Sequence, residues 1–176
     1  MLKKWDSLPD FMKNDAVRPY YEILRKKKAS LFLKRVFDIL VGLIILIITA
    51  IPMTIIAVMI KLDSEGPVFY RQERVTTYGK HFTIHKFRTM VSNADKIGST
   101  VTIDHDNRIT KVGAKLRGYR LDELPQVFDV LRGNMSFVGT RPEAVKYVEM
   151  YKPEYMATLL MPAGITSEAS IRYKDE

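Results

Sequence analysis

The sequence predicts an α+β fold that is mainly helical, and three observations support this. A continuous apolar run from Ile39 to Ile60 is long enough for a membrane helix. Strand-like segments on either side of a turn at Tyr78-Gly79 predict a β-hairpin. Short apolar stretches at helical spacing later in the chain predict helices that either pack in a core or lie in a membrane interface.

The composition favours one compact domain with anionic partners. The chain has 176 residues, 47% of them apolar, which suffices for one core and a membrane segment. Its net charge of +8 favours a phospholipid surface, a nucleic acid or a phosphorylated small molecule. The chain contains no cysteine, which excludes disulfides and thiolate metal sites. His81, His85 and His105 lack a compact metal-ligand spacing.

The apolar run itself predicts a bent membrane helix. As a helix, Ile39 to Ile60 would rise about 33 Å, and Pro52 would remove a backbone hydrogen bond within it. We expect Thr49 to help satisfy the carbonyls that Pro52 frees. Basic residues flank both ends of the run, so both a kinked transmembrane span and a helix that bends and returns fit the charges. The run begins too far into the chain for a cleavable signal peptide.

Residues 1–28 interleave aromatic and apolar side chains with charges and end in Arg25-Lys26-Lys27-Lys28. This composition suits an interfacial segment whose basic end meets anionic headgroups. A solvated tail is the alternative.

The elements after the membrane run are predicted from turn and cap residues. Strands are expected at residues 68–71 and 81–87, and residues 91–113 are expected to be irregular apart from a short helix near Asn93 to Ile97. Three further helices are expected. The first has Asp122 as its N-cap and ends before Gly133. The second begins at Thr140 with Pro142 in its first turn, and the third extends from Glu154 to Met161.

Two adjacent carboxylates, Asp122 and Glu123, are the main candidates for chemistry. In a regular helix they would point apart, so a change of backbone conformation is needed to bring both to one site. An ionised aspartate can attack phosphorus, and a glutamate can hold Mg²⁺ together with phosphate oxygens. Cations suited to phosphate surround the pair: Lys86, Arg88, Arg117, Arg120 and Arg141, the last at a predicted helix start. The alternative is that Asp122 only caps a helix, Glu123 faces water and the arginines are surface charges.

Six ordered blocks carry a resemblance to a known family. The chain resembles the bacterial sugar transferases called monotopic phosphoglycosyl transferases, which load undecaprenyl phosphate with a first sugar phosphate. The blocks are Lys34-Arg35-Val36-Phe37-Asp38, the stretch from Gly66-Pro67 to Arg74-Val75, Lys86-Phe87-Arg88-Thr89-Met90, Arg108-Ile109-Thr110-Lys111-Val112-Gly113, Leu121-Asp122-Glu123-Leu124-Pro125-Gln126, and the stretch from Met135-Ser136 to Arg141-Pro142.

The resemblance implies a two-step ping-pong reaction. Asp122 would attack the β-phosphate of a UDP-sugar and release UMP, and polyprenyl phosphate would then accept the phosphosugar. Glu123 with Asp122 would bind Mg²⁺. The implied phosphate-site residues are Lys86, Arg117 and Arg141, to which Arg88 is added on its chemistry alone.

Composition and the resemblance together predict three parts. Residues 1–32 form an interfacial N-terminal extension by their composition, and the resemblance implies a re-entrant membrane helix (33–62) and a cytoplasmic catalytic domain (63–176). The implied location is the cytoplasmic face of a bacterial inner membrane. The implied partners are a UDP-sugar, polyprenyl phosphate and anionic phospholipid, with no nucleic acid, and a homodimer is compatible.

The chain departs from the family pattern at two places. Ile51-Pro52 replaces Ser-Pro at the helix break, and Thr140 stands before Arg141-Pro142 where the family often has proline. The chain ends at Tyr173 to Glu176 without an obvious terminating element, which is compatible with a further C-terminal region.

A different class of function is a non-catalytic basic protein that binds or organises a membrane surface. It would bind in a salt-sensitive way and show no Mg²⁺-dependent turnover. No pattern in the sequence specifies which sugar would be transferred.

Overall fold

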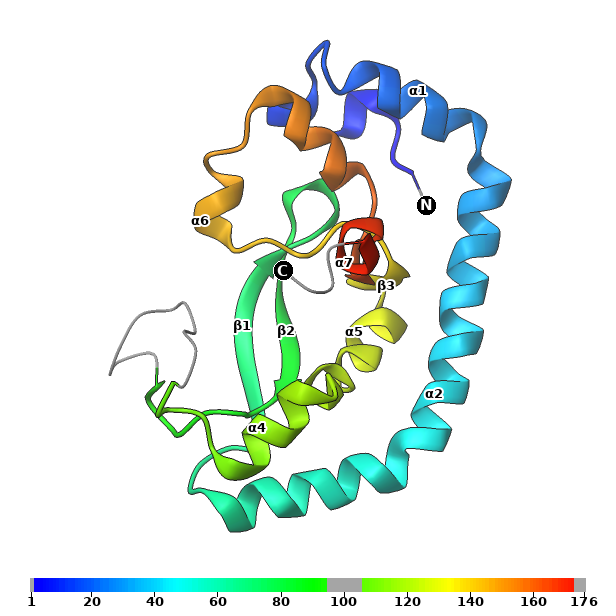
Figure 1. The fold of residues 1–176 in the computed structure, drawn as a ribbon. Coiled ribbons are helices and arrows are strands. Elements are labelled where there is room, and N and C mark those ends of the chain that lie inside the picture. Colours follow the sequence, from blue (N-terminus) through cyan, green and yellow to red (C-terminus); the bar gives the residue numbers. More distant parts are fainter. Residues whose placement is uncertain (1, 95–105, 173–176) are drawn as a thin grey trace.

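The computed structural model describes residues 2–94 and 106–172 (Figure 1). The fold is mainly helical, which confirms the predicted class. In chain order the elements are η1 (Trp5–Ser7), η2 (Asp10–Met12), α1 (Arg18–Lys26), α2 (Lys28–Asp63), β1 (Phe69–Val75), η3 (Thr77–Gly79), β2 (His81–Phe87), α4 (Lys111–Gly118), η4 (Leu121–Glu123), α5 (Gln126–Arg132), β3 (Met135–Val138), α6 (Val145–Val148), η5 (Pro153–Leu160), β4 (Ala163–Thr166) and α7 (Glu168–Arg172), where η marks a 3-10 helix.

The membrane run forms the central part of α2, a helix of 36 residues with Pro52 inside it. Figure 1 shows that α2 bends sharply in its cyan stretch, so that two limbs frame one side and the lower edge of the molecule. Among the described residues, α2 alone is long and apolar enough to cross a membrane. Only 11% of its most apolar 18-residue stretch is buried within the protein. The bend agrees with the distortion that the internal proline predicts.

Thr49 does not play the predicted part at this bend. Its hydroxyl donates to the carbonyl of Ile45 at 2.7 Å, whereas Pro52 deprives the carbonyl of Ile48, four residues before it, of a partner. The prediction for Thr49 is therefore wrong: its hydroxyl bonds the carbonyl one turn before it in the helix, as threonines often do.

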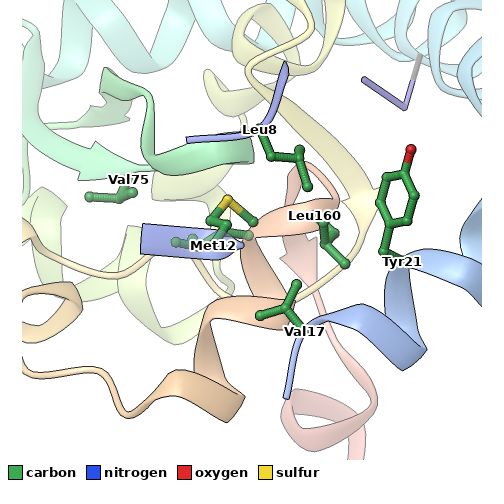
Figure 2. Close-up of a cluster of buried hydrophobic side chains, with 7 residues drawn as sticks. Leu8, Met12, Val17, Tyr21, Val75 and Leu160 are labelled. Atoms are coloured by element: carbon green, nitrogen blue, oxygen red, sulfur yellow. The ribbon is translucent and has the colours of Figure 1, made fainter. Parts of the chain in front are cut away.

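The N-terminal segment packs into the protein, which excludes a solvated tail. Leu8, Met12, Val17 and Tyr21 are buried in one apolar cluster with side chains from β1 and η5, and Figure 2 shows this cluster around the Met12 sulfur. Each such side chain contributes about 1.5–3 kcal/mol when fully buried. The segment thus covers η5, while its exposed apolar side chains Phe11, Tyr20 and Ile23 remain on the outside.

The predicted hairpin is confirmed: β1 and β2 pair antiparallel, with Tyr70 opposite Lys86. A second, parallel pair of β3 and β4 has no counterpart in the prediction. Its connection runs through α6 and η5, where the predicted helix from Glu154 forms as the 3-10 helix. The short helix predicted near Asn93 to Ile97 extends into residues outside the described part.

The start predicted for the next helix, at Thr140, is wrong, because residues 141–144 are not helical; of the predicted segment, Val145–Val148 forms the helix α6. The backbone here is held by partners far away in the sequence. The N–H of Gly164 donates to the carbonyl of Thr140 at 2.7 Å, and the N–H of Val75 donates to the carbonyl of Glu143 at 3.0 Å. These bonds to β4 and β1 replace the local bonds of a helix, so Arg141 gains no helix dipole.

Candidate functional site: the Asp122–Glu123 turn

The two carboxylates lie on a tight turn between α4 and α5. Arg120 has a positive φ of 54°, and the chain then makes the single 3-10 turn η4. The predicted N-cap role of Asp122 is wrong, since α5 begins only at Gln126 and no side chain caps it. The predicted end of this helix is confirmed by Gly133 in the left-handed region. The turn therefore supplies the change of backbone conformation that the two acids would need to reach one site.

Glu123 is joined to the hairpin by an ion pair. The Nζ of Lys86 on β2 lies 2.5 Å from Oε1 of Glu123, and the two side chains are 22% and 19% exposed. A charge-assisted bond at this partial burial is stronger than a surface pair. It connects β2 to the acid turn and places an ammonium beside both carboxylates.

Asp122 has a perturbed acidity. Partial burial raises the pKa of its carboxyl above the ordinary value, and the negative charge of Glu123 adds to this rise. The positive charges of Lys86 and Arg117 act in the opposite direction. Because its electron pairs are less tightly stabilised by solvent, a desolvated carboxylate is a better nucleophile than one in water.

Arg117 is held at the other side of the acid turn, where its Nε donates to Oγ1 of Thr89 at 2.9 Å. Thr89 follows β2 by two residues, so the hairpin supports both Lys86 and Arg117. These two cations are the predicted phosphate ligands that act electrostatically on Asp122.

Arg141 reaches the same region from the connection after β3. It lines a pocket together with Lys86, Glu123, Gln126 and Arg74 of β1. Burial and the positive charge of Arg141 lower the pKa of Arg74. The pocket lining thus gathers three cations, with Glu143 acting on Arg74 and Asp122 lying near Lys86. Such a group of arginine and lysine side chains suits a bound anion.

Sequence reasoning did not single out Arg74. Gln72 and Arg74 alternate with exposed positions along β1, and that two-residue period could have placed them on one face of the hairpin. Their side chains also bond each other, with Nη2 of Arg74 donating to Oε1 of Gln72 at 2.5 Å.

The structure does not bring Arg88 into this pocket. Its side chain is 5% exposed, and its guanidinium donates to the carbonyls of Ser64 at 2.6 Å and Glu65 at 2.7 Å, beyond the end of α2. Arg120, the remaining candidate, is exposed at the turn.

The histidines make separate pairs. His81 lies 3.2 Å from Glu73, and His85 lies 2.9 Å from the buried Asp129; His105 is outside the described residues. Within residues 2–94 and 106–172, no three His, Cys, Asp or Glu side chains are grouped as a metal site would need.

Comparison of the sequence with known proteins finds a matching family model and several similar proteins. A family model described as bacterial sugar transferase matches residues 29–176. The chain is 41% identical over 143 residues to UDP-N-acetylgalactosamine-undecaprenyl-phosphate N-acetylgalactosaminephosphotransferase of Aeromonas hydrophila, covering 80% of this chain and 34% of the relative. It is 43% identical over 143 residues to UDP-glucose:undecaprenyl-phosphate glucose-1-phosphate transferase of Escherichia coli (strain K12), covering 79% of this chain and 31% of the relative.

A third relative is closer in length. The chain is 40% identical over 150 residues to the exopolysaccharide production protein PSS of Rhizobium leguminosarum bv. phaseoli, covering 81% of this chain and 75% of that protein. The matched part thus spans about a third of the two named transferases and three quarters of PSS.

Proposed function

Because the chain belongs to the bacterial sugar transferase family, we propose that it transfers a sugar 1-phosphate from a UDP-sugar to polyprenyl phosphate and releases UMP. The observation that carries this proposal is the Asp122–Glu123 turn facing Lys86, at a pocket that Arg74 and Arg141 also line. A perturbed carboxylate among cations suits attack on a phosphoryl group. Relatives named for undecaprenyl-phosphate sugar transfer support the substrate class.

In the first step, a carboxylate oxygen of Asp122 attacks the β-phosphorus of the UDP-sugar. The bond between this phosphorus and the bridging oxygen breaks, UMP leaves, and the sugar phosphate remains on Asp122 as an acyl phosphate. The raised pKa of Asp122 makes its carboxylate more nucleophilic. Lys86, Arg117 and Arg141 neutralise the phosphate charge that would otherwise repel the attacking anion.

In the second step, an oxygen of the polyprenyl phosphate attacks the same phosphorus. The bond to Asp122 breaks, the carboxylate is restored, and polyprenyl diphosphate sugar is released. The lipid arrives from a membrane that holds α2, whose apolar side chains are largely exposed along its length. The proposal includes a re-entrant course for α2, on the cytoplasmic face of the inner membrane, as the family resemblance implies.

Mg²⁺ is part of the proposal, with Glu123 and Asp122 as its protein ligands. Mg²⁺ in phosphoryl-transfer sites is bound through one or two carboxylates and the substrate's own phosphates, which fits a pair of adjacent acids without a third. When bound, the ion would neutralise diphosphate charge. Lys86 holds Glu123 in place through their ion pair. Once Glu123 binds Mg²⁺, Lys86 would contact the substrate phosphate.

The test is UMP release from a panel of UDP-sugars, using detergent-solubilised protein with Mg²⁺ and undecaprenyl phosphate. We expect release with one or more donors, and we expect Asp122→Asn to abolish it. Asp10→Asn is a matched control, because this aspartate side chain is 99% exposed and far from the site in the N-terminal segment. Full activity of Asp122→Asn would refute the nucleophile. Salt-sensitive vesicle binding without turnover of any donor would instead support the non-catalytic, membrane-surface function.

A further inference from the structure

The end of α2 is tied to the catalytic part of the protein by one buried guanidinium. The last carbonyls of a helix have no partner within it. Arg88 donates to the carbonyls of Ile60 at 3.4 Å and Ser64 at 2.6 Å, and to Oγ of Ser64 at 2.9 Å. Its other terminal nitrogen donates to the carbonyl of Glu65. A cation here also interacts favourably with the negative end of the helix dipole.

The backbone beside this guanidinium leaves no room for a side chain at position 66. Gly66 has a φ of 123°, and a side chain at that position would overlap the guanidinium of Arg88 and the hydroxyl of Ser92. Gly66 is therefore needed both for its left-handed conformation and for the space that Arg88 fills. The sequence reasoning placed Arg88 with the phosphate ligands; its surroundings give it a different task.

A second contact joins the end of α2 to α4, through a side chain of α2 that accepts a backbone hydrogen bond. Oδ2 of Asp63, the last residue of α2, accepts the N–H of Val112 at 3.0 Å. This bond satisfies a free donor in the first turn of α4, and the other end of α4 leads to Arg117 and the acid turn. Figure 1 shows the lower limb of α2 running beneath α4.

The segment that carries Arg88 also carries the site. Two residues earlier, Lys86 pairs with Glu123, and one residue later, Thr89 accepts the Nε of Arg117. Within four consecutive residues, Lys86 thus contacts the acid turn, Arg88 the end of α2, and Thr89 a phosphate-site arginine. A displacement of the α2 end relative to β2 would therefore change where α2 lies relative to the acid turn.

We propose that Arg88 is a positioning residue that fixes the second limb of α2 relative to Lys86, and that it thereby sets how the lipid phosphate is presented to Asp122. The inference rests on the proposed function for its kinetic part only. The lipid tail lies in the membrane with α2, while its phosphate must reach the acid turn. The height and angle of α2 relative to the hairpin decide whether the lipid tail can stay in the membrane while the lipid phosphate reaches the acid turn. The UDP-sugar approaches from water and does not depend on this height.

The structural part is tested without turnover, by the distance between two spin labels. The chain has no cysteine, so labels can be attached at Leu62→Cys on α2, which is 83% exposed, and at the exposed Thr83→Cys on β2. In lipid nanodiscs we expect a narrow distance distribution that becomes broad or shifted with Arg88→Met. Arg132→Met, which removes an exposed arginine from α5, is the matched control and should leave the distribution unchanged.

The kinetic part compares the two substrates in the same variants. We expect Arg88→Met to raise the KM for polyprenyl phosphate about tenfold, the order of one lost charged hydrogen bond, with the KM for UDP-sugar changed less than about twofold. Arg88→Lys retains the charge but cannot reach several carbonyls at once, and should give an intermediate value.

An unchanged distance distribution in Arg88→Met would overturn the proposal, as would equal KM increases for the two substrates. If Arg88→Met does not fold, Asp63→Ala, which removes the acceptor of the Val112 N–H, tests the same junction from the other side and should broaden the distribution with the same bias towards the lipid KM. If the distance distribution broadens in Arg88→Met but the unmodified protein turns over no UDP-sugar, the role of Arg88 at the α2 junction is supported and the proposed function is refuted.

Discussion

The protein holds two groups of buried or half-buried carboxylates beside lysines, and they are built in opposite ways. Asp38 in α2 is 4% exposed. Its Oδ2 accepts the hydroxyl of Ser136 at 2.8 Å and lies 3.4 Å from Nζ of Lys34, and its Oδ1 accepts the N–H of Phe137 at 3.3 Å. At the acid turn, Glu123 has one cationic partner, Lys86, and Asp122 has a raised pKa.

The difference separates a structural charge from a reactive one. Both carboxylate oxygens of Asp38 accept hydrogen bonds, so its charge joins the first limb of α2 to β3. The adjacent Arg35 strengthens this joint by donating to the carbonyls of Val130 and Leu131 at the end of α5. Asp122 is kept partly desolvated beside Lys86 and Arg117, a state that costs stability and suits chemistry.

The largest expected effect comes from neutralising the reactive carboxylate. Asp122→Asn should lower UMP release at least about a thousandfold, because the amide cannot form the acyl phosphate. Its thermal stability in detergent should be equal to or higher than that of the unmodified protein, since a desolvated charge is removed. Melting curves together with UMP assays measure both quantities. A clear loss of stability would mean that Asp122 is a structural group like Asp38.

The converse variant is Asp38→Asn. It leaves the ammonium of Lys34 beside a neutral group and loses an acceptor of the buried network, so we expect a destabilisation of about 3–5 kcal/mol. The fraction that remains folded should keep the UDP-sugar KM, because Asp38 does not line the site. Denaturant unfolding followed by far-UV circular dichroism checks the first expectation. Loss of activity at full stability would contradict the structural assignment.

An intermediate effect is expected from pH. Protonated Asp122 cannot attack phosphorus, and burial raises its pKa, so the rate of UMP release should fall with decreasing pH at values above those of an ordinary aspartate. The positive charge of Lys86 lowers this pKa, so Lys86→Gln should move the acidic limb to higher pH. Single-turnover UMP release without lipid is the suitable assay, because it avoids titration of the lipid phosphate. A limb that shifts to lower pH in Lys86→Gln would be inconsistent with this electrostatic coupling.

The sequence predicted what is decided locally. The hairpin follows from alternating residues around Tyr78-Gly79, and the end of α5 from Gly133, because a turn or a C-cap needs only its neighbours. The acids and Lys86 were also identified correctly as neighbours, through the family blocks. Of the cations that line the pocket, Lys86 and Arg141 were among the predicted phosphate-site residues and Arg74 was not.

The failures have a common cause in distant partners. Thr140 starts no helix because Gly164 and β1 take up the backbone bonds around it. Arg88 is drawn to α2 by carbonyls more than twenty residues earlier in the chain. The packing of Met12 against η5 was likewise not predicted, while the membrane-interface location of the N-terminal segment stays a prediction. Periodicity and cap rules contain none of these pairings.

The smallest expected effect concerns Arg120. This residue either shapes the acid turn or binds phosphate, and two substitutions separate these roles. At a φ of 54°, a non-glycine residue carries a strain of order 1 kcal/mol, which glycine would relieve at the cost of a more flexible unfolded chain. Arg120→Gly should therefore change the free energy of unfolding by less than about 1 kcal/mol, whereas Arg120→Val should destabilise by about 1–2 kcal/mol, since a β-branched side chain is poorly tolerated there. If Arg120 only shapes the turn, Arg120→Gly keeps the UDP-sugar KM; a large increase in that KM with unchanged stability would make Arg120 a phosphate ligand, and the acid turn would then bind its substrate through the same residue that bends it.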